Sequence, residues 1–143
     1  MARLGTPLAI ASKYSNLPPT IAIMFRAQLK SKIHRAVVTG ADIAYEGSIS
    51  IPSDLMREAD IWPGEKVLVA SITTGNRLET YAQIGEEGSG RITINGGAAH
   101  RIKTGERITI LAWGLSEKPI DPIKLLCNEN NEIIKSSFSA DPI

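Results

Sequence analysis

Alternating apolar and polar residues predict a chain built mainly from short β-strands. Residues 47–51 read Gly-Ser-Ile-Ser-Ile, which places the isoleucines on one face of a strand and the serines on the other. Other runs rich in Val, Ile and Leu end at Gly, Pro or Asn, and these predict strands at residues 32–39, 66–73, 77–84, 91–94 and 107–113. Six short strands separated by tight turns are typical of a small closed β-barrel.

Short helices and turns complete this pattern. Residues 52–59 predict a helix, because proline suits a first helical turn and the acidic Asp54 favours the helix dipole. Beyond residue 113 the strand signal fades into a turn at 128–131, an edge strand at 132–135 and a loose tail.

The chain has 143 residues, which fits one domain of ordinary size. We expect residues 1–23 to be a flexible N-terminal extension, residues 24–115 to form the barrel domain, and residues 116–143 to form a C-terminal segment and tail.

Composition excludes several classes of function. The net charge is +1, with 16 Lys and Arg scattered among 15 Asp and Glu, so nothing predicts a nucleic-acid partner. No apolar run approaches the length of a membrane span. Cys127 is the single cysteine, which suits a reducing, cytoplasmic location. It shows no zinc-binding spacing with the two histidines, so no metal is expected.

Strand geometry groups several residues that could carry chemistry. Lys32 and His34 share one strand face, and Arg77 and Tyr81 share another, so a cation, an imidazole and a phenol could converge on one pocket. The alternative is that they are ordinary solvated residues of the barrel. Ser48 lacks the Gly-x-Ser-x-Gly setting of a hydrolase nucleophile, and no phosphate-binding loop is present.

Five motifs and a late Gly105 decide between these readings by their order and spacing. They are Lys32-x-His34-Arg35, Ala41-Asp42-x-x-Tyr45-Glu46-Gly47-Ser48, Thr74-Gly75-Asn76-Arg77-x-x-Thr80-Tyr81, Gly88-Ser89-Gly90-Arg91 and Asn95-Gly96-Gly97-Ala98-Ala99-His100. Together they resemble the pyruvoyl-dependent aspartate 1-decarboxylase family. The resemblance runs from Met24 to Trp113, does not reach residues 1–23 and is thin after Trp113.

The resemblance implies a double-psi β-barrel and a self-processing lyase that uses no metal. Removing an α-carboxyl group needs an electron sink, which a ketone supplies by forming a Schiff base with the substrate amine. In the family this ketone is a covalent pyruvoyl group derived from serine. Here the Ser48 hydroxyl would attack the carbonyl of Gly47, and elimination would leave a β chain ending at Gly47 and an α chain beginning at former Ser48.

Further site residues carry over from the family by motif. Arg77 and Lys32 match residues that bind the substrate carboxylate, and Thr80 matches the threonine needed for self-cleavage. Tyr81 matches the proton donor. His34 and Tyr45 match residues that line the site, while Asn95, Gly96, Gly97 and Ala98 match the loop that covers the substrate. The family most often has alanine where this chain has Gly97, and we expect little effect on the chemistry.

The resemblance also implies partners and a pathway. The substrate would be L-aspartate, the product β-alanine for pantothenate and coenzyme A, and the assembly a homotetramer with active sites between subunits. Glutamate or another small acidic amino acid stays open as a substrate, because one methylene is weakly discriminated. Whether cleavage needs a maturation helper protein is also open.

A binding protein is the alternative from a different class. Gly47-Ser48-Ile49-Ser50-Ile51-Pro52, the short helix and the turn at Pro63-Gly64 resemble swapped-hairpin DNA-binding regulators. That hypothesis predicts a basic surface and leaves Arg77, Tyr81 and Asn95 without a role.

Overall fold

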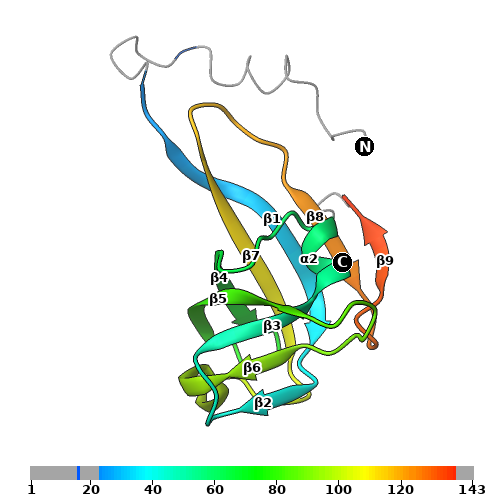
Figure 1. Cartoon of the computed structure of the whole chain (residues 1–143). Coiled ribbons are helices and arrows are strands. Elements are labelled where there is room, and N and C mark those ends of the chain that lie inside the picture. Colours follow the sequence, from blue (N-terminus) through cyan, green and yellow to red (C-terminus); the bar gives the residue numbers. More distant parts are fainter. Residues whose placement is uncertain (1–15, 17–22, 138–143) are drawn as a thin grey trace.

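A computed structural model describes residue 16 and residues 23–137 (Figure 1). The expectations for residues 1–22 therefore lie almost wholly outside the described residues, as does the predicted tail beyond residue 137. Nine strands and two short helices make up the described part. They are β1 (Arg26–Val37), β2 (Gly40–Asp42), β3 (Ser48–Pro52), α2 (Ser53–Glu58), β4 (Lys66–Ser71), β5 (Arg77–Gly85), β6 (Thr93–Asn95), the 3₁₀-helix η2 (Gly96–His100), β7 (Arg107–Ser116), β8 (Ile123–Cys127) and β9 (Ile133–Ser136).

All nine strands belong to one sheet, in the order β2-β6-β3-β5-β4-β7-β1-β8-β9. Only Val38 and Thr39 separate β1 from β2, although the two strands stand far apart in that order. The backbone N–H of Val38 donates to Glu106 O at 3.0 Å, and that of Thr39 donates to Ile92 O at 2.8 Å. The chain therefore passes from the β7 side of the sheet to the β6 side in two residues, which closes the sheet into a barrel.

The barrel interior is filled by one face of each main strand. The inward-pointing side chains are each 0% exposed, and their neighbours along the strand point to the opposite face. They include Ile33, Ile49, Ile51, Val67 and Ile110. Burial of such side chains contributes about 1.5–3 kcal/mol each, so this apolar core provides the main stabilisation. The opposite, outer face of the sheet carries polar side chains together with exposed apolar ones such as Trp113 and Leu115.

The predicted mainly β fold is confirmed, and the closed sheet is consistent with the double-psi β-barrel that the resemblance implies. All six predicted strands are present, with β1 starting six residues earlier than expected and β7 ending three residues later. The predicted helix is α2, and the predicted edge strand is β9. The count of six strands is too low, because β2 and β8 were not predicted.

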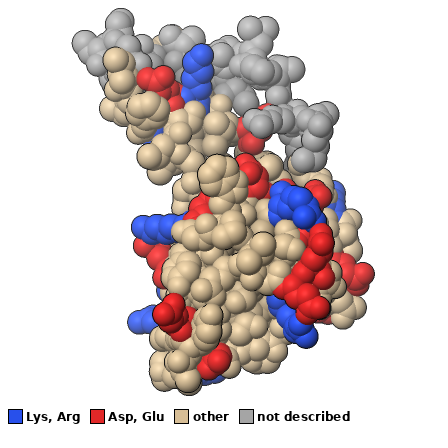
Figure 2. Space-filling model, viewed as in Figure 1, with Lys and Arg blue, Asp and Glu red and all other residues tan. Residues whose placement is uncertain are grey.

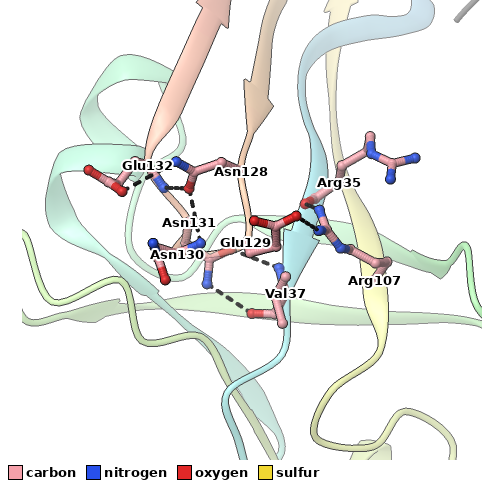
Figure 3. Close-up of polar contacts among 8 residues, drawn as sticks. All are labelled: Arg35, Val37, Arg107, Asn128, Glu129, Asn130, Asn131 and Glu132. Atoms are coloured by element: carbon pink, nitrogen blue, oxygen red, sulfur yellow. Dashed lines mark hydrogen bonds and ion pairs between the residues drawn. The ribbon is translucent and has the colours of Figure 1, made fainter.

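The β8–β9 hairpin is fastened to the barrel by the side chain of Asn131 (Figure 3). Its Nδ2 donates to Val37 O at 2.9 Å and to Gly90 O at 2.7 Å, while its Oδ1 accepts from the Val37 N–H at 2.7 Å. Asn131 is 3% exposed and has a φ of +59°, a conformation that asparagine tolerates better than most residues. One buried amide thus joins the hairpin, the end of β1 and the loop before β6.

Candidate active site

Ser48 opens β3, a strand held on both sides. Ile49 pairs with Ala82 of the parallel strand β5, and Ser48 pairs with Asn95 of the antiparallel strand β6. Ile49 and Ile51 point into the core and are 0% exposed, so alternation turns Ser48 and Ser50 to the outer face. Ser48 is nevertheless 0% exposed, because side chains from the neighbouring strands cover it.

Two amide side chains hold the Ser48 hydroxyl. Asn95 Nδ2 donates to Ser48 Oγ at 2.9 Å, and Ser48 Oγ donates to Gln83 Oε1 at 3.0 Å. The same Asn95 Nδ2 also donates to Ser50 Oγ at 3.1 Å. Ser48, Ser50, Gln83 and Asn95 therefore form one polar cluster, which we call the serine cluster, on the outer face of three adjacent strands.

The peptide before Ser48 is packed against Gly96. Gly47 itself is exposed, and a Cβ built on Gly96 would lie 2.7 Å from both the Cα and the N of Gly47. It would also lie 3.0 Å from Tyr45 O. Asp42 Oδ1 accepts from the Ala44 N–H at 3.0 Å at the start of the same loop. The loop from β2 to β3 thus has a side-chain hydrogen bond at its start, from Ala44 to Asp42, and packs directly against Gly96 at its end.

Tyr81 lies level with Ser48, because Ile49 pairs with Ala82. The pairing of β5 with β4 runs without interruption from Arg77 to Tyr81, so alternation holds along this stretch. Tyr81 therefore shares the outer face with Gln83 and Ser48. Thr80 points to the other face, opposite the buried Val67, as the strand geometry predicts.

Arg77, Lys32 and His34 also lie on this outer face, with Arg77 on β5 and the other two on β1, three strands away. Arg77 pairs with Ala70, and Ala70 pairs with Thr109 of β7. The Oγ1 of Thr109 is 3.0 Å from His34 Nδ1 on β1. Lys32 lies two residues before His34 on this face, paired with Leu111 of β7. We call Arg77, Lys32 and His34 the basic group.

The surroundings of His34 keep its side chain uncharged. Burial lowers the pKa of the imidazole below its usual value, and the neighbouring charges of Lys32 and Arg35 lower this pKa further. Arg35 has a φ of +61° and lies where the register of β1 shifts between Ile33 and Ala36. Near neutral pH the lowered pKa therefore favours the neutral form of the His34 imidazole.

Within one chain the serine cluster and the basic group lie on different strands. In the order of the sheet, four spacings of about 4.8 Å each lead from β3 to β1 through β5, β4 and β7. Arg77 lies four residues before Tyr81, about 13 Å along β5 from the level of Ser48. The structure thus brings Ser48, Tyr81 and Asn95 onto adjacent strands, whereas Lys32, which is predicted to bind the substrate carboxylate, lies on another part of the sheet.

The segment after Asn95 is a single 3₁₀ turn rather than an extended loop. Asn95 is the N-terminal flanking residue of η2, and its side chain is 4% exposed. Gly97 is exposed, and nothing lies within 4 Å of a Cβ built on it. An alanine would fit there, so the departure from the family pattern at Gly97 has no steric cause. Ala98, the last residue of the predicted loop, is half-buried.

Gln83 and Ser50 are site residues that the sequence reasoning did not identify. Gln83 stands two residues after Tyr81, so the same strand alternation that groups Arg77 with Tyr81 also places Gln83 on that face. The missing information was the parallel register of β3 on β5, which sets Gln83 against Ser48. That pairing joins residues more than 30 positions apart and has no local pattern.

Comparison with known proteins agrees with this geometry. The family model described as aspartate decarboxylase matches residues 24–134. The chain belongs to the aspartate decarboxylase family. Aspartate 1-decarboxylase 1 of Frankia casuarinae is 45% identical over 124 residues, which cover 84% of this chain and 79% of that protein. Aspartate 1-decarboxylase of Syntrophotalea carbinolica is 54% identical over 90 residues, 63% of this chain and 69% of its own length.

The surface does not favour the DNA-binding alternative. On the face that Figure 2 shows, Lys and Arg side chains are interspersed with Asp and Glu and form no continuous basic patch. Among the described residues, no three or more His, Cys, Asp and Glu side chains are grouped so that they could hold a metal ion. In the same part of the chain, no helix has the length and apolar composition that a membrane crossing requires.

Proposed function

We propose that this chain is a self-processing decarboxylase that converts L-aspartate to β-alanine and carbon dioxide. The observation that carries the proposal is the environment of the Ser48 hydroxyl. It points to the outer face of the sheet, is shielded from solvent, and is hydrogen-bonded by Asn95 and Gln83 next to the Gly47 peptide. An ordinary strand serine needs no such pair of amide partners. Membership of the aspartate decarboxylase family supplies the reaction class.

Self-cleavage begins with attack of Ser48 Oγ on the carbonyl carbon of Gly47. The amide becomes an ester, and elimination across Cα and Cβ of Ser48 then breaks the Cβ–O bond. Gly47 keeps the oxygen as a new carboxylate, and the dehydroalanine left behind takes up water and releases ammonia to become a pyruvoyl group. Thr80 is proposed to hold the polarised Gly47 carbonyl as negative charge develops.

The residues around Ser48 fit the group that would form there. A pyruvoyl group supplies a ketone that takes the substrate amine and accepts the electrons freed by decarboxylation. Asn95 Nδ2 loses one of its two acceptors when Ser48 Oγ departs with Gly47, so one of its N–H groups becomes available for substrate while the other can still donate to Ser50 Oγ. Tyr81 is level with this position and is proposed to protonate the substrate carbon.

We infer that each active site is shared by two copies of the chain in a homotetramer. Lys32 and His34 lie on β1, four strands from β3 in the order of the sheet, and Arg77 lies four residues before Tyr81 on β5. Both groups face outward on the same sheet, so a second copy can bring its basic group to the first copy's serine cluster. The Arg77 guanidinium then binds the substrate carboxylate in bidentate fashion, while His34 and Tyr45 line the site.

Mass spectrometry under denaturing conditions tests self-cleavage directly. Purified wild-type protein is expected as two chains, residues 1–47 and 48–143, with the second carrying a ketone in place of the Ser48 amine. Ser48→Ala should remain one intact chain and release no carbon dioxide from aspartate. An uncut Ser48→Ala protein with wild-type activity would refute the mechanism.

Two further experiments identify the preferred substrate and show whether self-cleavage needs a helper protein. Incubation with aspartate and separately with glutamate, followed by assay of carbon dioxide and the product amine, should show much faster release from aspartate. Cleavage of protein made in a purified translation system would indicate that no maturation partner is required. The β-alanine formed would enter pantothenate and coenzyme A synthesis in the cytoplasm.

A further inference from the structure

Gln83 is the acceptor for the proton of the Ser48 hydroxyl. A hydroxyl group has one proton to donate and two lone pairs that accept. The proton points to Gln83 Oε1 at 3.0 Å, and one lone pair receives Asn95 Nδ2 at 2.9 Å. The second lone pair is left for the carbonyl carbon of Gly47, so the two amides together select the orientation of the nucleophile.

Gln83 has little other reason to occupy this position. It lies in β5 between the buried Ala82 and the exposed Ile84, on a strand face where its register partner is Ser50. The Ser50 hydroxyl already accepts from Asn95 Nδ2 at 3.1 Å. The hydrogen bond to Ser48 is therefore the side-chain contact that distinguishes Gln83 from any other residue that would fit a strand.

We propose that Gln83 is a positioning residue for self-cleavage, an inference that rests on the proposed function. In the step it governs, Ser48 Oγ bonds to the Gly47 carbonyl carbon and the bond from that carbon to the Ser48 nitrogen breaks. The proton that leaves the hydroxyl is balanced by the proton that the freed nitrogen gains. An amide oxygen is too weak a base to keep the proton, so Gln83 orients the hydroxyl rather than ionising it.

Two substitutions at Gln83 separate orientation from packing. Gln83→Met keeps the length of the side chain and removes the acceptor, so cleavage should slow on the order of tenfold. Gln83→Glu keeps an acceptor that titrates. Above the pKa of the new carboxyl group, its carboxylate accepts a hydrogen bond from the Ser48 hydroxyl. Below that pKa the protonated acid can donate a hydrogen bond to Ser48 Oγ instead, which misorients the hydroxyl. Its cleavage rate should therefore rise with pH, unlike that of wild type over the same range.

The measurement follows the loss of intact chain by denaturing mass spectrometry after cell-free synthesis. Circular dichroism and thermal midpoints confirm that each variant folds. Glu79→Met is the matched control, because Glu79 lies on the same face of β5 and its ion pair with Lys66 at 3.1 Å is exposed. It should cleave at the wild-type rate.

The outcomes distinguish this inference from the proposed function. Wild-type protein that never cleaves would overturn the proposed function itself. If wild-type protein cleaves and Gln83→Met cleaves at the same rate, only the role of Gln83 is overturned. Where Gln83→Met fails to fold, Gln83→Glu decides alone, since a cleavage rate without any new pH dependence would contradict the proposal.

Discussion

At Gly96 the backbone has a φ of +69° and lies against the peptide that we propose is cut. A Cβ at this position would stand 2.7 Å from two backbone atoms of Gly47, a separation that real Cβ atoms essentially never show. Backbone rather than a flexible side chain is on the other side of the contact, so the loop from β2 to β3 would have to move. The absence of a side chain at Gly96 thus lets the backbone N and Cα of Gly47 lie directly against it.

Gly96→Ala should therefore destabilise the protein and slow self-cleavage. The left-handed conformation costs alanine about 1 kcal/mol, and displacement of the loop adds to this cost. We expect a lower thermal midpoint and at least a tenfold slower loss of intact chain, a factor that corresponds to about 1.4 kcal/mol in the barrier.

Gly97→Ala is the matched control, because a Cβ there meets nothing within 4 Å. That variant should cleave at the wild-type rate, with stability unchanged or raised by about 0.5 kcal/mol. Equal cleavage rates for Gly96→Ala and Gly97→Ala would show that contact with Gly47 does not matter.

At the scale of elements, the β8–β9 hairpin depends on one buried amide. Asn131 satisfies the N–H and carbonyl of Val37 and the carbonyl of Gly90, as Figure 3 shows for Val37. Gly90 is required beside it, because a Cβ there would lie 2.5 Å from Asn130 O. A salt bridge from Arg107 to Glu129 at 3.3 Å adds an exposed contact to the same turn.

Asn131→Ala should lower the free energy of unfolding by about 1–3 kcal/mol, because it leaves partly buried backbone groups of Val37 and Gly90 without their side-chain partner. Urea titration followed by circular dichroism measures this change. Asn130→Ala is the control one residue earlier, since the Asn130 side chain is exposed and its backbone stays in place. It should change the unfolding free energy by no more than about 0.5 kcal/mol. Equal losses from both variants would contradict the assigned role of the Asn131 amide.

Local pattern predicted most strands that bury an alternating face, and missed two strands that are held by distant parallel pairing. β3 was predicted from Ser48-Ile49-Ser50-Ile51 because two isoleucines enter the core. β2 has only three residues and is held by its parallel pairing with β6, so it leaves no periodic signal. β8 likewise depends on parallel pairing with β1, which joins Ser31 to Ile123. The serine cluster depends on the same kind of distant register, and so Gln83 could not be found from the sequence.

On the scale of the whole molecule, the outer face of one sheet carries both halves of the proposed site. The serine cluster and Tyr81 lie on β3, β5 and β6, whereas Lys32 and His34 lie on β1 beyond β4 and β7. Arg77 pairs with Ala70, Ala70 pairs with Thr109, and Thr109 Oγ1 lies 3.0 Å from His34 Nδ1. Assembly therefore has a chemical role in the proposed function, because it brings the basic group of one copy to the ketone of another.

Pairs of inactive variants test this arrangement by complementation. Ser48→Ala lacks the ketone but keeps Arg77, whereas Arg77→Ala cleaves itself but lacks the guanidinium. Each alone should be inactive toward aspartate. Coexpressed in equal amounts, they should form mixed tetramers in which about a quarter of the sites combine a ketone from one chain with Arg77 from the other, with a matching share of wild-type activity.

Ser48→Ala coexpressed with Tyr81→Phe is the control that decides how the residues are divided. Tyr81 is level with Ser48 on the neighbouring strand, so every ketone in this mixture comes from a chain whose own Tyr81 is replaced. Activity per ketone should stay at the level of Tyr81→Phe alone. Activity per milligram of protein should fall further, because the Ser48→Ala chains contribute no ketone. Rescue by Tyr81→Phe together with failure of Arg77→Ala would place Arg77 in the same chain as its ketone and reverse the proposed division, because only residues contributed by different copies can complement each other.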